Sequence, residues 1–190
     1  MVFTSYYMSG KFNDQFLVAS SIAGDEQAFG KLYDKYVDEI YRFVVMRVRS
    51  SHEAQDLVAE VFLKTWQYIS SQKNQIKDFR AFLYRIARNL VIDYYRASKK
   101  EYTTFEEGQL EKIIDSGIDL ESDAQNKDDL RIIFSVMDQL PEDHRELLSL
   151  RYIQDLSIKE IAEIQGKKSG TVRVALHRAI KQVKTLIVDT

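Results

Sequence analysis

Apolar residues recur at helical spacing along most of this chain, and very little interrupts them. The 190 residues include one proline and seven glycines, too few to supply the turns between the strands of an all-β fold. One stretch has a continuous apolar stripe, which is typical of a helix with one buried face. The stripe runs through Phe29, Leu32, Tyr33, Tyr36, Ile40, Phe43 and Val44. The sequence therefore predicts an all-α protein, and 45% hydrophobic residues are enough for a packed core.

The helical segments fall into two groups, and the stretch between them is acidic. Residues 101–127 contain eight acidic and two basic residues and few large aliphatic ones, a composition that favours a flexible linker. Fully extended, this linker would reach roughly 90 Å. We therefore expect two small helical domains, at 12–100 and 128–190, and a disordered leader at 1–11. The predicted helices cover about 13–24, 25–49, 52–70, 79–98, 130–140, 141–152, 158–165 and 170–188, and Asp25 is a plausible N-cap for the second of them.

Several classes of function are disfavoured by composition. No cysteine is present, which excludes disulfides and thiolate metal sites. His52, His144 and His177 lie far apart without a metalloprotease spacing, and no glycine-rich phosphate loop appears. We expect no enzyme activity, metal, cofactor or small-molecule substrate. The N-terminus lacks the pattern of a secretory signal, and no apolar run could span a bilayer, so we expect a cytoplasmic protein.

The stretch 79–96, FRAFLYRIARNLVIDYYR, combines an apolar stripe with arginines and tyrosines that fall largely outside it. Guanidinium groups neutralise phosphates, and aromatic rings stack on unpaired bases. This helix therefore suits single-stranded or locally opened nucleic acid. An ordinary solvated basic face with core tyrosines is the alternative. The residues outside the stripe are Arg80, Tyr84, Arg85, Arg88, Asn89, Tyr95 and Arg96.

A helix-turn-helix is predicted near the C-terminus. Ser157 and Glu160 have capping-box spacing before a short helix, and Gly166 permits a tight turn. The final helix follows Ser169, a second candidate cap, and residues 165–184 carry six basic residues and no acidic one. Its N-terminal half would enter a major groove, where Arg173 could contact guanine while Ser169 and Thr171 contact phosphates. A helical hairpin with a basic rim is the alternative.

Three motifs in this order resemble the extracytoplasmic-function (ECF, group IV) members of the sigma-70 family of bacterial RNA polymerase initiation factors. DLVAEVFLKTW at 56–66 resembles region 2.2, the stretch 79–96 resembles regions 2.3 and 2.4, and 140–179 resembles region 4. The chain departs from the usual pattern at Ala59, where glutamine is common, and at Val174-Ala175, where Ser-Arg is common. Promoter preference is therefore not transferable from relatives.

The resemblance implies partners and residue roles. Asp56 and Glu60 would face the clamp coiled coil of bacterial core RNA polymerase. The −10 element of promoter DNA would be engaged, as its strands separate, by Lys73, Asn74, Arg80, Tyr84, Arg85, Arg88 and Asn89. The −35 element would be read by Arg173, Val174, His177 and Arg178. An anti-sigma factor is a further implied partner.

Two other hypotheses follow from these observations. The chain could be a stand-alone helix-turn-helix regulator with an N-terminal sensor or dimerisation domain, although this leaves the basic aromatic helix and the Asp56/Glu60 face without a role. Separately, the apolar Val174 could contact a thymine methyl group in the major groove.

Overall fold

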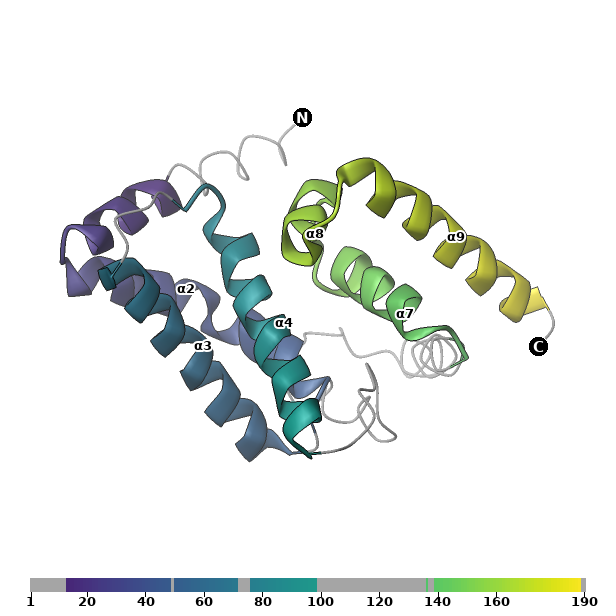
Figure 1. Cartoon of the computed structure of the whole chain (residues 1–190), viewed down its shortest axis with the longest axis horizontal. Helices are drawn as coiled ribbons and strands as arrows, with labels where there is room; N and C mark the ends of the chain where they lie inside the picture. The colour runs from purple at the N-terminus through teal and green to yellow at the C-terminus, as the bar shows by residue number, and fades with distance from the viewer. Residues whose placement is uncertain (1–12, 49, 72–75, 99–135, 137–138, 189–190) are drawn as a thin grey trace, which may run out of the picture.

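The structure is a computed structural model that describes residues 13–48, 50–71, 76–98, 136 and 139–188. Throughout these residues the regular elements are helices (Figure 1). The predicted all-α fold with two small helical domains is therefore confirmed. The predicted leader 1–11, the linker 101–127 and most of the predicted helix 130–140 lie outside the described residues.

The N-terminal group contains a helical segment at 13–22 and three long helices, α2 Glu26–Val45, α3 Ser51–Ser71 and α4 Phe79–Ser98. The predicted cap Asp25 is confirmed, because its Oδ1 accepts hydrogen bonds from the backbone N–H groups of Gln27 (3.0 Å) and Ala28 (3.1 Å). Helix α2 ends at Val45, four residues earlier than the sequence predicted.

Helices α2, α3 and α4 share one core. Leu32, Ile40, Val61 and Leu83 are fully buried there, as predicted from helical spacing. Tyr33 was also predicted to face inward, but it is 40% exposed. Aromatic pairs join the helices, including Phe29 with Trp66, whose ring centroids lie 4.9 Å apart. One side of the basic helix α4 is held by this core.

The C-terminal group contains α7 Glu142–Leu148, a π-helical turn η1 Ser149–Ile153, α8 Ile158–Gln165 and α9 Ser169–Val188. The predicted capping box is confirmed, with both Ser157 and Glu160 side chains bonded to backbone N–H groups. Gly166 has φ +64°, a left-handed conformation that ends α8 and turns the chain into α9. Together α8 and α9 form the predicted helix-turn-helix.

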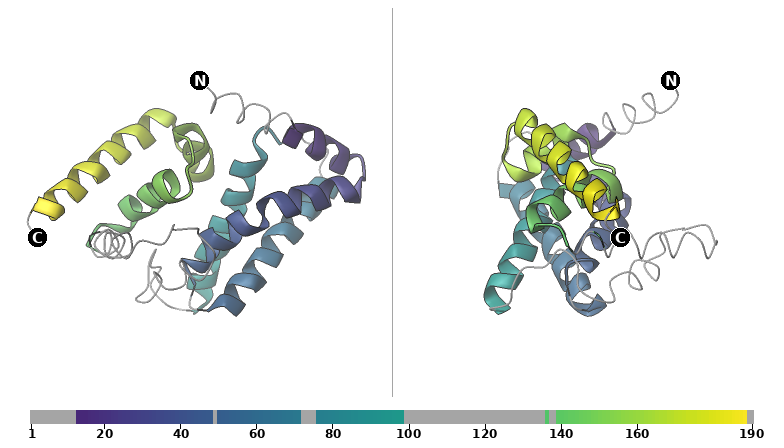
Figure 2. Two further views of the ribbon diagram at one scale, coloured as in Figure 1. Left: turned by 180° about the vertical axis from the view of Figure 1, so that it is seen from behind. Right: turned by 90° about the vertical axis from the view of Figure 1, so that its right-hand side faces the viewer.

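The two groups contact each other in this structure. Helix α8 lies against α4, and the views in Figures 1 and 2 agree on this arrangement. Hydrogen bonds also cross from the N-terminal group to η1 and α7. Consequently α4, the helix predicted to meet DNA, has its own core on one side and the C-terminal group on another.

Candidate nucleic-acid interface

The outer face of α9 is open to solvent. The six residues predicted to meet a −35 element are all exposed, and Val174 is 53% exposed although it is apolar. On the opposite side of the helix Val172, Leu176 and Ala179 are buried. This burial fixes the rotation of α9 and presents its polar face to a ligand. The exposed residues are Ser169, Thr171, Arg173, Val174, His177 and Arg178.

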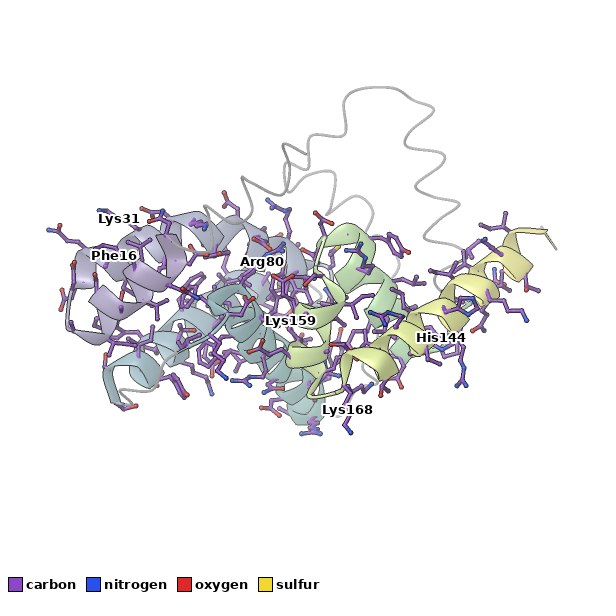
Figure 3. The ribbon with its side chains drawn as sticks, turned by 90° about the horizontal axis from the view of Figure 1, so that it is seen from above. Phe16, Lys31, Arg80, His144, Lys159 and Lys168 are labelled. Atoms are coloured by element: carbon purple, nitrogen blue, oxygen red, sulfur yellow. The ribbon has the colours of Figure 1, made fainter. Side chains whose placement is uncertain are left out.

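Positive charge lies along the same face and in the turn that precedes α9. The six cationic side chains are all exposed, so phosphates could reach them. His144, from α7, lies beside this helix (Figure 3), and its Nδ1 is 2.8 Å from Oε1 of Gln182. A shallow groove lined by His144, Gly170, Thr171, Val174, Ala175 and Arg178 opens there. The cationic residues are Lys167, Lys168, Arg173, Arg178, Lys181 and Lys184.

On α4 the structure divides the predicted residues into two sets. Arg85 and Asn89 are exposed one turn apart, with the Arg85 guanidinium 5.3 Å from the centre of the Phe82 ring. Tyr84 and Tyr95 are 0% and 2% exposed, so the prediction that they fall outside the buried stripe is wrong.

The burial of both tyrosines has local causes. The Tyr84 ring packs edge-on against Phe43, with centroids 5.0 Å apart. The Tyr95 hydroxyl donates a 2.6 Å hydrogen bond to the backbone carbonyl of Arg47. For these two residues the alternative interpretation, core tyrosines, is the correct one.

Arg80 is tied to α2 and to the C-terminal group. Its Nε donates to Oε1 of Glu39 (2.5 Å), and its Nη2 donates to the backbone carbonyl of Gln154 (2.7 Å). Burial acts to lower the pKa of Arg80, but the Glu39 carboxylate raises it above its ordinary value. The guanidinium is therefore a permanent charge, and Figure 3 shows it where the two groups meet.

Arg88 makes a two-pronged contact with Glu146. Nε and Nη2 donate to the two carboxylate oxygens of Glu146, at 2.6 Å and 3.1 Å. The arginine side chain is 25% exposed and the glutamate side chain 3% exposed. Such forked contacts are among the stronger charge-assisted hydrogen bonds. In this arrangement a phosphate cannot take the place of the carboxylate on Arg88.

The predicted acidic pair lies on the outer face of α3. Asp56 is 72% exposed and 3.1 Å from Nδ1 of His52, and Glu60 is 45% exposed and 3.2 Å from Nζ of Lys64. Leu63, one turn further along, is 55% exposed. A partner could therefore reach two carboxylates and an apolar side chain on one surface.

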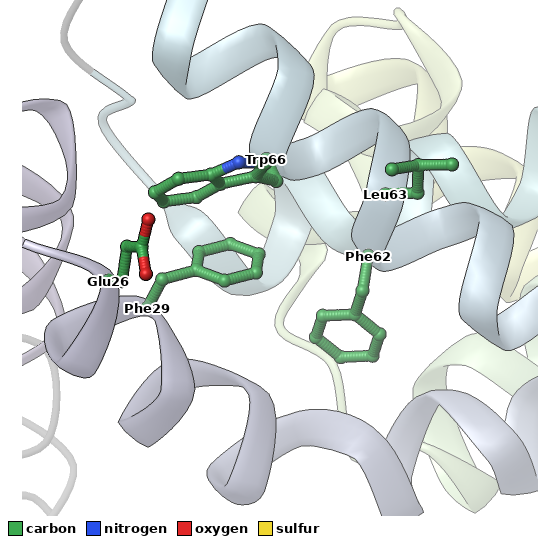
Figure 4. Close-up of a pocket in the computed structure, with 5 residues that line it drawn as sticks. All are labelled: Glu26, Phe29, Phe62, Leu63 and Trp66. Atoms are coloured by element: carbon green, nitrogen blue, oxygen red, sulfur yellow. The ribbon is translucent and has the colours of Figure 1, made fainter. Parts of the chain in front are cut away.

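An apolar groove between α2 and α3 adjoins that surface. It is lined by Glu26, Phe29, Phe62, Leu63 and Trp66 (Figure 4). This groove was not predicted from the sequence. The signal available was Leu63, an apolar residue outside the buried stripe of α3.

Lys73 and Asn74 lie outside the described residues. Among the residues that are described, no group of His, Asp or Glu side chains could hold a metal ion. In the same part of the chain no helix is long and apolar enough to cross a membrane.

Two sequence families match the chain, in the order of its two helical groups. Residues 32–101 match sigma-70 region 2, and residues 130–183 match sigma-70 region 4.

Full-length relatives are similar as well. The ECF RNA polymerase sigma factor BldN of Streptomyces coelicolor is 35% identical over 91% of this chain, which spans only 65% of BldN. The ECF sigma factor SigW of Bacillus subtilis is 32% identical over 87% of this chain and 92% of SigW. The ECF sigma-E factor of Escherichia coli is 33% identical, over 90% and 93% respectively.

Two solved structures share the fold. CnrH, determined in complex with the cytosolic domain of CnrY, aligns with a TM-score of 0.65 at 21% identity, covering 93% of this chain and 98% of CnrH. RpoE of Bartonella quintana, determined with the anti-sigma factor NepR, aligns with a TM-score of 0.59 at 21% identity, covering 84% and 96%.

Proposed function

This chain belongs to the extracytoplasmic-function family of RNA polymerase sigma factors, and we propose that it directs a bacterial core RNA polymerase to its promoters and helps to open them. The exposed basic face of α9 is the observation that carries the proposal. In this assignment residues 12–100 act on the polymerase and the −10 element, and residues 128–190 act on the −35 element. Residues 101–127 connect the two, and 1–11 form a leader.

At the −35 element α9 would lie in the major groove. Its N-terminal half presents the exposed side chains of Arg173, Val174 and His177 to the bases. Ser169 and Thr171 lie at the start of the helix, where the backbone N–H groups favour phosphate binding. Arg173 would read guanine, and a good contact of this kind contributes about 1–3 kcal/mol of discrimination. Arg178 and the neighbouring lysines supply attraction that does not depend on sequence.

At the −10 element α4 would hold bases that leave the stack. Arg85 and Asn89 are exposed and could act directly, whereas Arg80 and Arg88 would act once their present partners are released. Lys73 and Asn74 would contribute from the preceding loop. Stacking of captured bases, at about 1–3 kcal/mol each, offsets the cost of unpairing. The role requires no covalent chemistry from this chain.

Tyr84 has a different role in this proposal. Its ring is fully buried against Phe43, so it supports the position of α4 in the structure described. Contact between Tyr84 and a base would require the hydroxyl end of the ring to be uncovered first.

The polymerase would dock on α3. Asp56 and Glu60 are accessible carboxylates that suit a basic partner helix, and the exposed Leu63 extends this surface with apolar area. Charge at the rim favours encounter and orientation, while buried apolar area supplies affinity. This docking would place the chain in the cytoplasm with the enzyme.

An anti-sigma factor is the proposed regulator. CnrH and RpoE, which share this fold, were determined with CnrY and with the anti-sigma factor NepR. We propose that a protein of this kind binds the present chain too. The stand-alone regulator considered from the sequence is not favoured, because residues 32–101 match sigma-70 region 2.

Run-off transcription tests the proposed function. The purified chain and bacterial core RNA polymerase, combined on a promoter library, should start transcription at sites that core polymerase alone does not use. Arg173→Ala should weaken the use of those sites by about tenfold or more, since a bidentate guanine contact is removed. Lys31→Ala is the matched control, because it removes one exposed cation on α2 far from α9 (Figure 3). Identical start sites with and without the chain would contradict the proposal.

A further inference from the structure

We infer that His144, on α7, is a further promoter-contacting residue, which binds a phosphate of the DNA backbone at the edge of the −35 element. The inference rests on the proposed function, because it requires α9 to lie in the major groove there. Every −35 residue predicted from the sequence lies on α9, whereas His144 comes from a different helix.

His144 lies beside the DNA-facing side of α9 (Figure 3). It shares a groove of about 470 Å³ with Thr171, Val174 and Arg178, which belong to the set predicted to meet the −35 element. The other lining residues are Gly170 and Ala175, so none of the described residues that line this groove is acidic. The imidazole ring is therefore part of the same surface as the recognition helix.

Gln182 fixes the orientation of the imidazole ring. Its Oε1 lies 2.8 Å from Nδ1 of His144. An amide oxygen can only accept a hydrogen bond, so Nδ1 is the donor. Within the described residues Nε2 of His144 makes no hydrogen bond, and the side chain is only half-buried. Nε2 is therefore the ring nitrogen that a ligand can use.

The width of the major groove decides what His144 can contact. An α-helix with its side chains is about 10–12 Å across, and the major groove is about 12 Å wide, so α9 alone fills it. A side chain of α7 at the edge of α9 then lies over the sugar–phosphate backbone rather than over base edges. Thr171, which lines the same groove, has a phosphate-binding role in the proposed function.

The charges around the groove favour an anion. Arg178 lines it, and Lys181 is exposed on the next turn of α9. Glu142 and Asp143 precede His144 on α7, but neither lines the groove. A phosphate oxygen needs a donor, which Nε2 provides once the ring has taken up a proton from solvent, as histidine does readily in the physiological pH range. The contact is then a charge-assisted hydrogen bond from imidazolium to phosphate.

Neutralising one phosphate at a time tests this contact. Holoenzyme formed from the full chain and saturating core polymerase is titrated with a labelled promoter duplex obtained from the run-off experiment. Methylphosphonate linkages, which carry no negative charge, are placed singly along both strands of the −35 element, and fluorescence anisotropy measures Kd for each duplex. With the wild-type chain, neutralising the phosphate that His144 contacts should weaken binding about two- to fivefold, as is typical of an exposed charged contact.

His144→Phe is the principal variant, because it keeps a ring of similar size and removes both nitrogens. It should weaken binding of the unmodified duplex about two- to fivefold and abolish the effect of one methylphosphonate linkage alone. His144→Lys should restore part of the lost affinity, since it supplies a cation without the ring, which a merely structural role of the ring would not allow. Thr185→Ala, at an exposed position of α9 outside the groove, is the matched control and should leave the profile at wild type.

Two outcomes would overturn the inference. One is a methylphosphonate profile that is the same in the wild-type chain and in His144→Phe, and the other is a His144→Lys variant as weak as His144→Phe. If circular dichroism shows that His144→Phe loses helix, His144→Leu replaces it and the same outcomes apply.

Run-off transcription by the wild-type chain separates this inference from the proposed function. New start sites together with an unchanged profile in His144→Phe would remove the role of His144 alone. The absence of new start sites with the wild-type chain would remove the proposed function and this contact with it.

Discussion

Val174 is an apolar side chain on the DNA-facing half of α9, and 53% of it is exposed. We predict that it contacts a thymine methyl in the −35 element. Replacing each thymine of that element by uracil should then identify one position at which holoenzyme affinity falls about two- to fourfold, since burying a methyl group contributes roughly 0.8 kcal/mol. The readout is filter binding or anisotropy.

Val174→Ala is the control for this experiment, because it should abolish the difference between thymine and uracil at that position alone. Equal affinity for every uracil-substituted promoter would reject the contact. So would a thymine preference that persists in the variant.

Two buried phenols make stability depend on alkaline pH. Burial raises the pKa of Tyr84 and of Tyr36, and hydrogen bonding to Asp14 adds to the effect at Tyr36. Unfolded tyrosine ionises near pH 10, so above that pH the unfolded chain holds fewer protons than the folded one. The free energy of unfolding should therefore fall as pH rises, by up to about 1.4 kcal/mol per pH unit for each group.

Urea denaturation between about pH 9 and 11 measures this slope. Tyr84→Phe should reduce it, because one of the two groups is removed. Tyr152→Phe, at a position that is 61% exposed, controls for the loss of a phenol. A slope unchanged in Tyr84→Phe would show that this residue does not contribute.

At the residue scale, local patterns were predictable and remote partners were not. Asp25 and the Ser157/Glu160 box act within three residues, so the sequence revealed them. Ser50 and Glu53 have the same spacing and bond reciprocally at the start of α3, a signal that was available but missed. The partners of Tyr84 and Arg88 lie 70 and 58 residues away, and spacing on one helix carries no information about them.

At the scale of elements, the turn between α8 and α9 depends on Gly166. A Cβ there would meet no atom within 4 Å, but φ is +64°, so Gly166→Ala should destabilise by about 1 kcal/mol through backbone strain alone. Gly30 is the matched control. It also has open space around it but lies inside α2, where alanine should stabilise by about 0.5–1 kcal/mol.

Thermal unfolding followed by circular dichroism checks both substitutions. Opposite signs are expected, and a shift in the same direction would show that the local conformation at Gly166 does not limit stability. Helix positions were predicted within a few residues because each helix repeats its own apolar stripe. The π-helical turn η1 was not predicted, because the short apolar run around Leu150 fits an α-helix equally well.

At the scale of the whole molecule, the sequence predicted two domains but not their contact. The acidic residues 101–127 suggested independent modules. In the structure, hydrogen bonds join residues 58 to 102 positions apart, and buried apolar side chains of both groups belong to one core. No single motif marks a contact assembled from such distant parts of the chain.

The buried guanidinium of Arg47 also gives the molecule a thermal response. Hydration of a charged group becomes less favourable as temperature rises, so the penalty for keeping that group away from water declines. The buried contact between Arg47 and Ser149, which joins the two helical groups, should therefore hold better on warming and weaken on cooling.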